Sequence, residues 1–447
     1  MAATDGKVAA KGQAGQCPTL EFELVVRESV EAMRDDLVFI CRSTCASWAK
    51  ASSEDPDIVA TQVQGGITNL LYLLVNKGLK ADENRSLLVR IFGKKTDLMI
   101  DRNRDNGVMR MLSDLDFGPP CHGFFANGRV EGFFETYRAL KPNEMSHPRI
   151  MPLVAPELAR MHSLGVTAHP NSKLIGAKSA SLWDTIDSWL DKIKNDVDFG
   201  VGAGEGLGGG GGDGGGEGGG QGASGGVESE VAAKKEAEKK KTLELLDVDE
   251  MAREIAWLKS VLPARDGAAA AVEGAGAGTG TGTGTGTGAA AGTANAATTR
   301  AMAKATTAAV AFTDAVVFAH NDALAGNILY DEKADGGSGG VKLIDFEYGS
   351  WNFRGFDLAN HFCEFAGFDC DYFRGFPSRE VQQEFVTAYV GSDGSEFYSG
   401  DDEKVLFMDA VYGWLLLGVA WALVCAAAPF IPSPPHPLTP SPPLPLS

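Results

Sequence analysis

The sequence predicts an α+β fold in two lobes, a small N-terminal lobe built on an antiparallel sheet and a larger, mainly helical C-terminal lobe. Short runs rich in branched apolar residues dominate residues 21–140, whereas apolar residues at helical spacing dominate residues 141–428. Outside the two lobes, we expect residues 1–20 and the mostly proline residues 429–447 to be disordered.

Two low-complexity insertions, at 200–230 and 265–308, interrupt the C-terminal lobe. The first is rich in glycine with a few acids, and the second is an Ala/Gly/Thr repeat. Neither has enough bulky apolar side chains to offset the entropy lost on ordering. Because the cost of closing a loop grows slowly with its length, such insertions can leave the surface of a lobe without preventing it from folding. Roughly 300 residues remain, which suits one two-lobed domain.

The N-terminal lobe is predicted as a small sheet with one helix. Residues 22–53 mix apolar and acidic residues at helical spacing and form a helix-rich opening segment. The remaining elements are strands at 59–63, 70–75, 86–92 and 128–134, with a helix at 96–112 between the last two strands.

The C-terminal lobe is predicted mainly as helices. The helix at 181–193 has Ser181 as its cap and an apolar stripe formed by Trp183, Ile186, Trp189 and Leu190. The other helices are expected at 149–164, 232–262, 357–366 and 378–390.

Charge and cysteine content narrow the class of protein. The formal net charge of -19 argues against a general nucleic-acid binder, which needs a basic surface, and is compatible with a small cationic substrate. The seven cysteines show no zinc-site spacing, so we expect reduced thiols in a cytoplasmic protein. The first residues show no secretory signal.

The uncharged run 410–428 is marginally long enough to span a membrane, and a buried helix would look the same.

The most informative motif is a His-x-Asp-x-x-x-x-Asn pattern at His320, Asp322 and Asn327, followed by an apolar run that ends at Asp345. Phosphoryl transfer from a nucleotide needs a carboxylate that deprotonates the attacking hydroxyl, together with oxygen ligands for Mg²⁺. We therefore predict Asp322 as the catalytic base and Asn327 and Asp345 as metal ligands. His320 is predicted to be structural, and a chance origin of the whole pattern has odds of roughly one in ten.

A turn and two further residues are candidates for nucleotide binding. Gly65, Gly66, Thr68 and Asn69 lie in a turn between two predicted strands, where glycine permits close approach to phosphates. A plain hairpin turn is the more common explanation of such a sequence. Arg90 lies near the end of a predicted strand, as a phosphate-contacting cation or a paired structural residue, with Asp105 as its candidate partner.

Two residues, Glu364 and Trp421, are candidates for binding the substrate. Glu364 is a single acid in an aromatic-rich run, and it either faces solvent or attracts an ammonium group with the help of aromatic faces. Trp421 either packs in the core or completes such a cation pocket.

Asp357 is predicted to cap a helix or to tie the catalytic loop.

Taken together, these motifs resemble the choline/ethanolamine kinase family. The matching stretches are 65–69, 88–93 with Asp101 and Arg102, 158–162, 320–327, 344–348 and, as the most specific one, 355–367. The Glu-Phe-Ala-Gly sequence that begins at Glu364 favours the ethanolamine branch.

The resemblance implies a protein-kinase-like fold and phosphorylation of ethanolamine by ATP with Mg²⁺, the first step of phosphatidylethanolamine synthesis by the CDP-ethanolamine route. It also implies that Asp322 is the base, Arg90 the phosphate-contacting cation and Glu364 part of the amine pocket. A choline kinase, or an enzyme that accepts both amines, is the alternative. The run 410–428 is then a buried helix, no membrane span is expected, and assembly into a homodimer stays open.

The C-terminal part departs from the family pattern. Gly418 stands where the family has a first tryptophan, Cys425 replaces a glutamine, and the proline tail stands in place of a final helix. Since such changes expose core, we expect reduced stability there. They also motivate a rival hypothesis, a truncated kinase-like protein that binds nucleotide or partners without catalysis.

Overall fold

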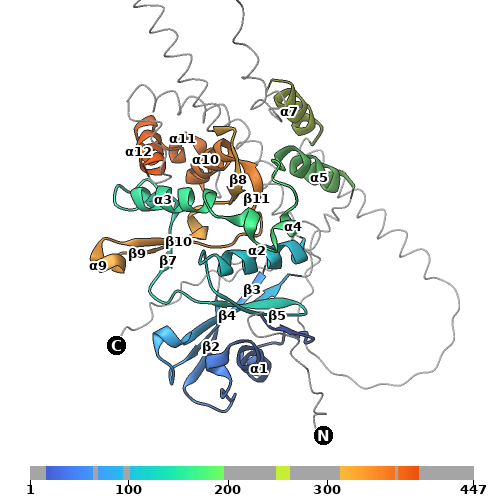
Figure 1. Ribbon diagram of the computed structural model, residues 1–447, viewed down its shortest axis with the longest axis vertical. Helices are drawn as coiled ribbons and strands as arrows, with labels where there is room; N and C mark the ends of the chain where they lie inside the picture. Colours follow the sequence, from blue (N-terminus) through green and yellow to red (C-terminus); the bar gives the residue numbers. More distant parts are fainter. Residues whose placement is uncertain are drawn as a thin grey trace, which may run out of the picture. The chain divides into compact units, whose positions relative to one another are not determined.

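The computed structural model describes residues 17–63, 69–93, 101–195, 248–261, 313–367 and 371–391 (Figure 1). These residues fall into two compact units. The first consists of residues 17–184 with 313–391, and the second of residues 185–195 with 248–261.

A six-stranded sheet forms the N-terminal part of the first unit, in the order β1-β5-β6-β4-β3-β2. Its strands are β1 (Thr19–Leu20), β2 (Ile58–Val63), β3 (Asn69–Asn76), β4 (Ser86–Phe92), β5 (Cys121–Phe125) and β6 (Gly128–Gly132). All neighbouring pairs are antiparallel except β1 and β5, which are parallel. The predicted strands at 59–63, 70–75 and 86–92 are confirmed, and the strand predicted at 128–134 ends two residues early.

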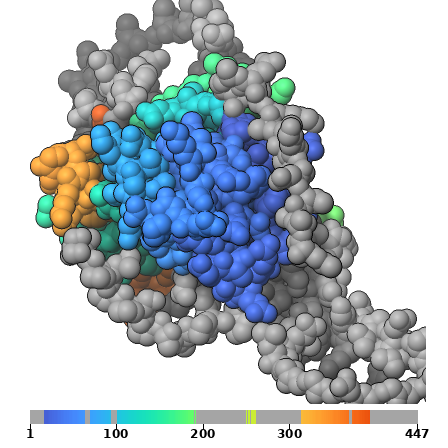
Figure 2. Space-filling view, turned by 90° about the horizontal axis from the view of Figure 1, so that it is seen from below, coloured from blue at the N-terminus to red at the C-terminus, as the bar shows by residue number. Residues whose placement is uncertain are grey.

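The sheet is covered by α1 (Arg34–Thr44), whose buried face includes Leu37, Ile40 and Cys41. Trp48 follows in a 3-10 helix, is 0 % exposed, and donates from Nε1 to the carbonyl of Asn84 at 2.8 Å. These side chains belong to one apolar cluster with the sheet strands. Seen from below, the blue N-terminal residues form a continuous surface (Figure 2). The helix-rich opening segment is thus one helix flanked by the 3-10 helices η1 (Glu31–Met33) and η2 (Ala46–Trp48).

The N-terminal boundary of the fold lies earlier than predicted. We expected residues 1–20 to be disordered, but Leu20 is 2 % exposed and β1 pairs with Phe124 and Phe125 of β5. A two-residue strand has no readable alternation, so its order comes from the partner strand and the core beneath it. The prediction of a boundary at residue 20 was wrong for 17–20, and residues 1–16 lie outside the described residues.

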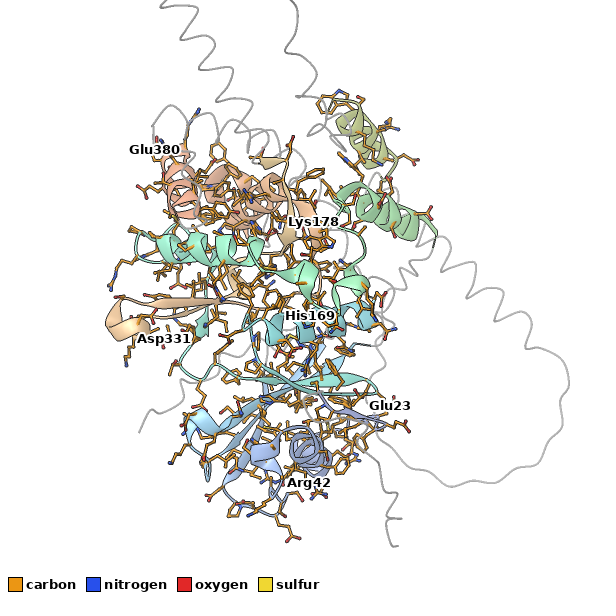
Figure 3. All side chains as sticks on the ribbon, in the orientation of Figure 1. Glu23, Arg42, His169, Lys178, Asp331 and Glu380 are labelled. Atoms are coloured by element: carbon orange, nitrogen blue, oxygen red, sulfur yellow. The ribbon has the colours of Figure 1, made fainter. Side chains whose placement is uncertain are left out.

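Helix α2 (Arg102–Asp114) starts at a side-chain cap, because Asp101 accepts hydrogen bonds from the backbone N–H groups of Asn103 and Arg104. The predicted helix began at residue 96, and residues 94–100 lie outside the described part of the chain. His169, labelled in Figure 3, lies beside this helix, with Nε2 3.3 Å from Asp114 Oδ2.

Helices dominate the rest of the first unit. They are α3 (Met151–His162), α4 (Ser172–Ile175), α9 (Ala334–Gly337), α10 (Arg354–Cys363), α11 (Tyr372–Gly375) and α12 (Arg379–Val390), with 3-10 helices η3 (Ala81–Glu83), η5 (Pro142–Glu144), η6 (Val166–Ala168), η8 (Ala325–Asn327) and η9 (Glu364–Ala366). Helix α3 packs against α12 and β8 (Figure 1). The helices predicted at 149–164, 357–366 and 378–390 are confirmed with small shifts at their ends.

Two small sheets in this helical part carry the motif loops. One contains β7 (Arg138–Ala139), β9 (Ile328–Asp331) and β10 (Gly340–Leu343), and the other contains β8 (Val316–Ala319) and β11 (Ser350–Phe353). Figure 3 labels Asp331 at the end of β9. Because β8 leads into the His-x-Asp loop and β10 leads to Asp345, the two sheets fix both ends of the predicted active site.

The second unit contains α7 (Val248–Val261) and most of α5 (Leu182–Asn195). Ile186, Leu190 and Ile255 are buried, and Lys259 Nζ lies 2.5 Å from both carboxylate oxygens of Asp187. The helix predicted at 181–193 is confirmed, and 248–261 is the described part of the one predicted at 232–262. None of the helices within the described ranges is long and apolar enough to cross a membrane, and the run 410–428 lies outside them.

Replacing Trp48 tests the packing of α1 on the sheet. Because Trp48 is fully buried, we expect Trp48→Ala to lower the free energy of unfolding by about 3–5 kcal/mol. Urea denaturation followed by circular dichroism measures the change. The matched control is Trp257→Ala on α7, where the side chain is 56 % exposed and the change should stay within about 0.5 kcal/mol. Equal losses in both variants would contradict this description of the core.

Candidate active site

The two motif loops lie next to each other because their strands pair. Residues 328–331 of β9 pair with 340–343 of β10, and the backbone N–H of Ile344 donates to the carbonyl of Asn327 at 3.0 Å. Asn327 closes the short helix η8 directly before β9. The ends of both loops are therefore held together by backbone hydrogen bonds, which brings Asp322, Asn327 and Asp345 to one place.

Asp322 and Asn327 are in direct contact. The Asn327 amide nitrogen donates to Asp322 Oδ2 and to the Asp322 carbonyl, both at 2.9 Å. Burial raises the pKa of Asp322 well above its usual value, and the charges of Glu364 and Asp345 raise it further. The cluster is therefore rich in negative charge that a bound cation would stabilise.

The backbone at both motifs adopts a conformation that few residues tolerate. Asn321 has φ 63° and Asp345 has φ 64°, in the left-handed region. Asn and Asp are the non-glycine residues that enter this region most easily. Such conformations persist where surrounding contacts enforce them, as happens at functional sites.

Asp345 also forms an ion pair with Arg90 of strand β4. Arg90 Nη1 lies 3.4 Å from Asp345 Oδ1, and its Nε donates to Glu131 Oε1 at 2.9 Å. Burial alone would lower the pKa of Arg90, but the charges of Glu131 and Asp345 outweigh it and raise the pKa. Arg90 therefore stays charged although it is only 5 % exposed.

Within the sheet, the carboxylate that accepts a hydrogen bond from Arg90 is Glu131 and not the predicted Asp105. Asp105, our candidate partner, accepts instead from Arg129 Nη1 at 2.7 Å, and Arg129 Nε donates to Glu131 Oε1 at 2.6 Å. Arg90 and Arg129 are direct neighbours in the β4–β6 register, and Glu131 lies between them. Burial raises the pKa of Glu131, but the two arginines lower it overall to about 2.

Sequence reasoning missed Arg129 and Glu131. Both are about 2 % exposed, in a strand whose residues are all buried. Alternate charges in a strand of a small sheet normally indicate a solvent-facing side. The signal that identifies them is the cross-strand position opposite Arg90, which requires knowing the strand order.

Asp357 ties the catalytic loop to helix α10. Its Oδ1 accepts from the backbone N–H of Asn321 at 2.6 Å, and its Oδ2 accepts from that of His320 at 2.8 Å. His162 Nε2 lies 2.8 Å from the same Oδ2. Burial would raise the pKa of Asp357, but the hydrogen bond from His162 helps to outweigh it, so the pKa is lowered.

Further contacts hold the same loop and its neighbour His162 from other sides. His162 Nδ1 lies 2.6 Å from the Tyr389 hydroxyl on α12. His320 Nε2 donates to the carbonyl of Ile344 at 3.1 Å, and burial lowers the pKa of His320, which favours the neutral ring. His361 Nδ1 donates to the carbonyl of Ala323 at 2.7 Å. These contacts support a structural role for His320.

Glu364 lies at the start of η9, next to the catalytic loop. Its charge raises the pKa of Asp322, and its own pKa is raised to about 7 by burial. Among the contacts between described residues, no hydrogen bond or ion pair involves the Glu364 carboxylate. A half-buried carboxylate without a protein partner suits an ammonium ligand.

The donor set near Asp345 fits Mg²⁺. Both hydrogen bonds of the Asn327 side chain use its nitrogen, so the amide oxygen is available as a hard ligand. Glu347, which sequence reasoning missed, lies two residues after Asp345; burial and the Asp345 charge raise its pKa to about 8. The described residues contain no group of three or more His, Cys, Asp or Glu arranged to hold a metal by themselves. Mg²⁺ does not require one, since it keeps several waters and shares substrate phosphates.

Several predicted site residues cannot be placed. Gly65, Gly66, Thr68 and Trp421 lie outside the described residues, whereas Asn69 is the buried first residue of β3. Their assigned roles, and the predicted lobe boundaries at 21–140 and 141–428, stay predictions.

Known proteins share this combination of sequence and fold. The family model of choline/ethanolamine kinase matches residues 60–271 and 294–428. A probable ethanolamine kinase of Arabidopsis thaliana is 26% identical over 93% of this chain and 84% of its own length. Probable ethanolamine kinase A of Dictyostelium discoideum is 25% identical over 80% of this chain and 75% of its own length.

Two solved structures share the fold at low sequence identity. An ethanolamine kinase of Plasmodium vivax has a TM-score of 0.51 at 19% identity, covering 84% of this chain and 79% of that one. A choline kinase of Cryptosporidium parvum has a TM-score of 0.56 at 19% identity, covering 88% of this chain and 89% of that one. The predicted protein-kinase-like fold is thereby confirmed. Since the family model spans most of the sequence, the chain belongs to the choline/ethanolamine kinase family of phosphotransferases.

Proposed function

We propose that this protein transfers the γ-phosphoryl group of ATP to the hydroxyl of ethanolamine, the first step of phosphatidylethanolamine synthesis by the CDP-ethanolamine route. The observation that carries the proposal is the convergence of Asp322, Asp345 and Glu364 at one site. The names of the relatives in Arabidopsis and Dictyostelium support ethanolamine as the acceptor.

In the proposed reaction, Asp322 orients the substrate hydroxyl and accepts its proton. The hydroxyl oxygen forms a bond to the γ-phosphorus, the bond from that phosphorus to the bridging oxygen breaks, and ADP leaves. Asn327 donates to Asp322 Oδ2 and thereby fixes the carboxylate. Orienting the hydroxyl and accepting its proton each lower the barrier of such a reaction.

Asn327 and Asp345, with Glu347 beside them, are the residues that would hold Mg²⁺. When bound there, Mg²⁺ neutralises charge on the phosphates. Arg90 lies 3.4 Å from Asp345, which supports its proposed contact with the same phosphates. Glu131, with Arg129 and Asp105 behind it, keeps Arg90 oriented and charged.

Glu364 is the proposed anchor for the ammonium group. In ethanolamine, two carbons separate the ammonium group from the hydroxyl. A carboxylate near the catalytic base can therefore bind the ammonium group while Asp322 accepts the proton of the hydroxyl. Choline presents the same arrangement with a bulkier cation and stays the alternative substrate. The described cysteines are free thiols, which supports our proposal of a cytoplasmic location.

Removing the base tests the assignment of Asp322. We expect Asp322→Asn to lower kcat for ethanolamine phosphorylation by about 10²–10⁴-fold, because the variant cannot accept the hydroxyl proton. A coupled assay of ADP release measures kcat. Asp331→Asn at the end of β9 is the matched control and should keep normal kcat. A fully active Asp322→Asn protein would contradict the assignment.

The pH dependence of substrate affinity tests Glu364. With its pKa at about 7, the carboxyl is neutral below this pH and charged above it. A primary ammonium titrates at about pH 10, so the cation itself is almost unchanged at neutral pH. We expect KM for ethanolamine to fall by up to about tenfold per pH unit as pH rises to 7, and to level off above it.

The control for this experiment is Glu364→Gln, which should have a higher KM that no longer changes between pH 6 and 8. Competition with choline at equal concentration then distinguishes the two substrates. The same pH profile in both proteins would exclude Glu364 as the ammonium anchor.

A further inference from the structure

Cys17 and Cys121 form a close thiol pair outside the active site. Cys17 lies two residues before β1, and Cys121 is the first residue of β5, with which β1 pairs in parallel. Cys17 Sγ lies 3.6 Å from Cys121 Sγ and 3.4 Å from the Cys121 carbonyl. The match to the family model starts at residue 60, so Cys17 lies outside it.

The two thiols differ in reactivity. The hydrogen bond from Cys121 and the nearby Arg110 on α2 together lower the pKa of Cys17 to about 7, although burial and the charge of Asp114 oppose this. The same hydrogen bond and burial raise the pKa of Cys121. Cys17 is half-buried and Cys121 is buried. The half-exposed thiolate is therefore the nucleophile, and the buried thiol is in position to react second.

We propose that Cys17 and Cys121 are a reversible disulfide site, oxidised by a small-molecule disulfide such as glutathione disulfide. The Cys17 thiolate attacks one sulfur of glutathione disulfide, which forms a mixed disulfide and releases one glutathione thiolate. That thiolate accepts the proton of Cys121, whose sulfur then attacks Cys17 Sγ and releases the second glutathione. Two electrons pass from the pair to the oxidant, and a thiol reductant reverses both steps.

A second cysteine pair in the chain serves as an internal comparison. Cys41 and Cys45 lie four residues apart at the end of α1, and both are buried. Burial raises the pKa of Cys41, and Cys45 Sγ lies 3.2 Å from Ser47 Oγ. A pair without an accessible thiolate should not react with the same oxidant.

Disulfide formation would covalently link the segment before the edge strand β1 to the neighbouring strand β5. The bond would join residues 104 positions apart, and β1 is the end strand beside β5. Cys121 also pairs in register with Glu131, the residue that holds Arg90. Closing such a long loop restricts the unfolded chain, so the oxidised protein should unfold at a higher temperature, on the order of 5–10 °C.

The experiment uses full-length protein with Cys370→Ser and Cys425→Ser, so that the cysteines outside the described residues do not contribute. The folded protein is incubated with glutathione disulfide, alkylated and digested without reduction, and its peptides are identified by mass spectrometry. We expect one cross-linked pair, Cys17 with Cys121, which dithiothreitol removes. We also expect the higher unfolding temperature to appear and disappear with it.

Two variants make the result specific. Cys17→Ser should abolish both the cross-link and the temperature shift, and Cys121→Ser should stop at a mixed disulfide on Cys17. Kinase activity of Cys17→Ser should stay normal, because Cys17 is outside the active site. The proposal is overturned if no Cys17–Cys121 peptide forms, or if Cys41 and Cys45 cross-link to the same extent.

Discussion

The buried carboxylate of Asp357 is the contact on which the geometry of the catalytic loop depends. It accepts from two consecutive backbone N–H groups, at His320 and Asn321, and lies against His162. Since an enclosed charge without partners is strongly unfavourable, the loop conformation and the carboxylate stabilise each other. The left-handed backbone at Asn321 is one conformation that this contact enforces.

A second buried network joins the sheet to the motif loops. Arg90 reaches from β4 to Asp345, while Glu131 keeps the guanidinium in place from β6. The part of the protein that would hold the nucleotide is thereby connected to the part that would hold the metal. Because several charges share this low-dielectric region, the loss of one leaves its partners uncompensated and costs more than a surface ion pair.

The sequence predicted the elements and the chemistry better than the contacts. The strands around Arg90 follow from their branched apolar residues, and Asp322, Asn327 and Asp345 follow from fixed spacing within short loops. Asp105 and Glu131 show why partners are harder to predict. Which acid forms a hydrogen bond with Arg90 depends on strand order and on the register between β4 and β6, and neither is encoded in local spacing. The thiol pair likewise depends on β1 and β5 being neighbours, 104 residues apart.

The most direct test of this account is to measure turnover in Asp357→Asn. The substitution keeps the size of the side chain but turns an acceptor toward the backbone N–H groups into a donor. If Asp357 sets the loop geometry, kcat for ethanolamine phosphorylation should fall on the order of 100-fold, while the folded protein still binds nucleotide. Circular dichroism and nucleotide titration at a temperature below the unfolding transition establish the folded state. An unchanged kcat in the folded variant would contradict the account.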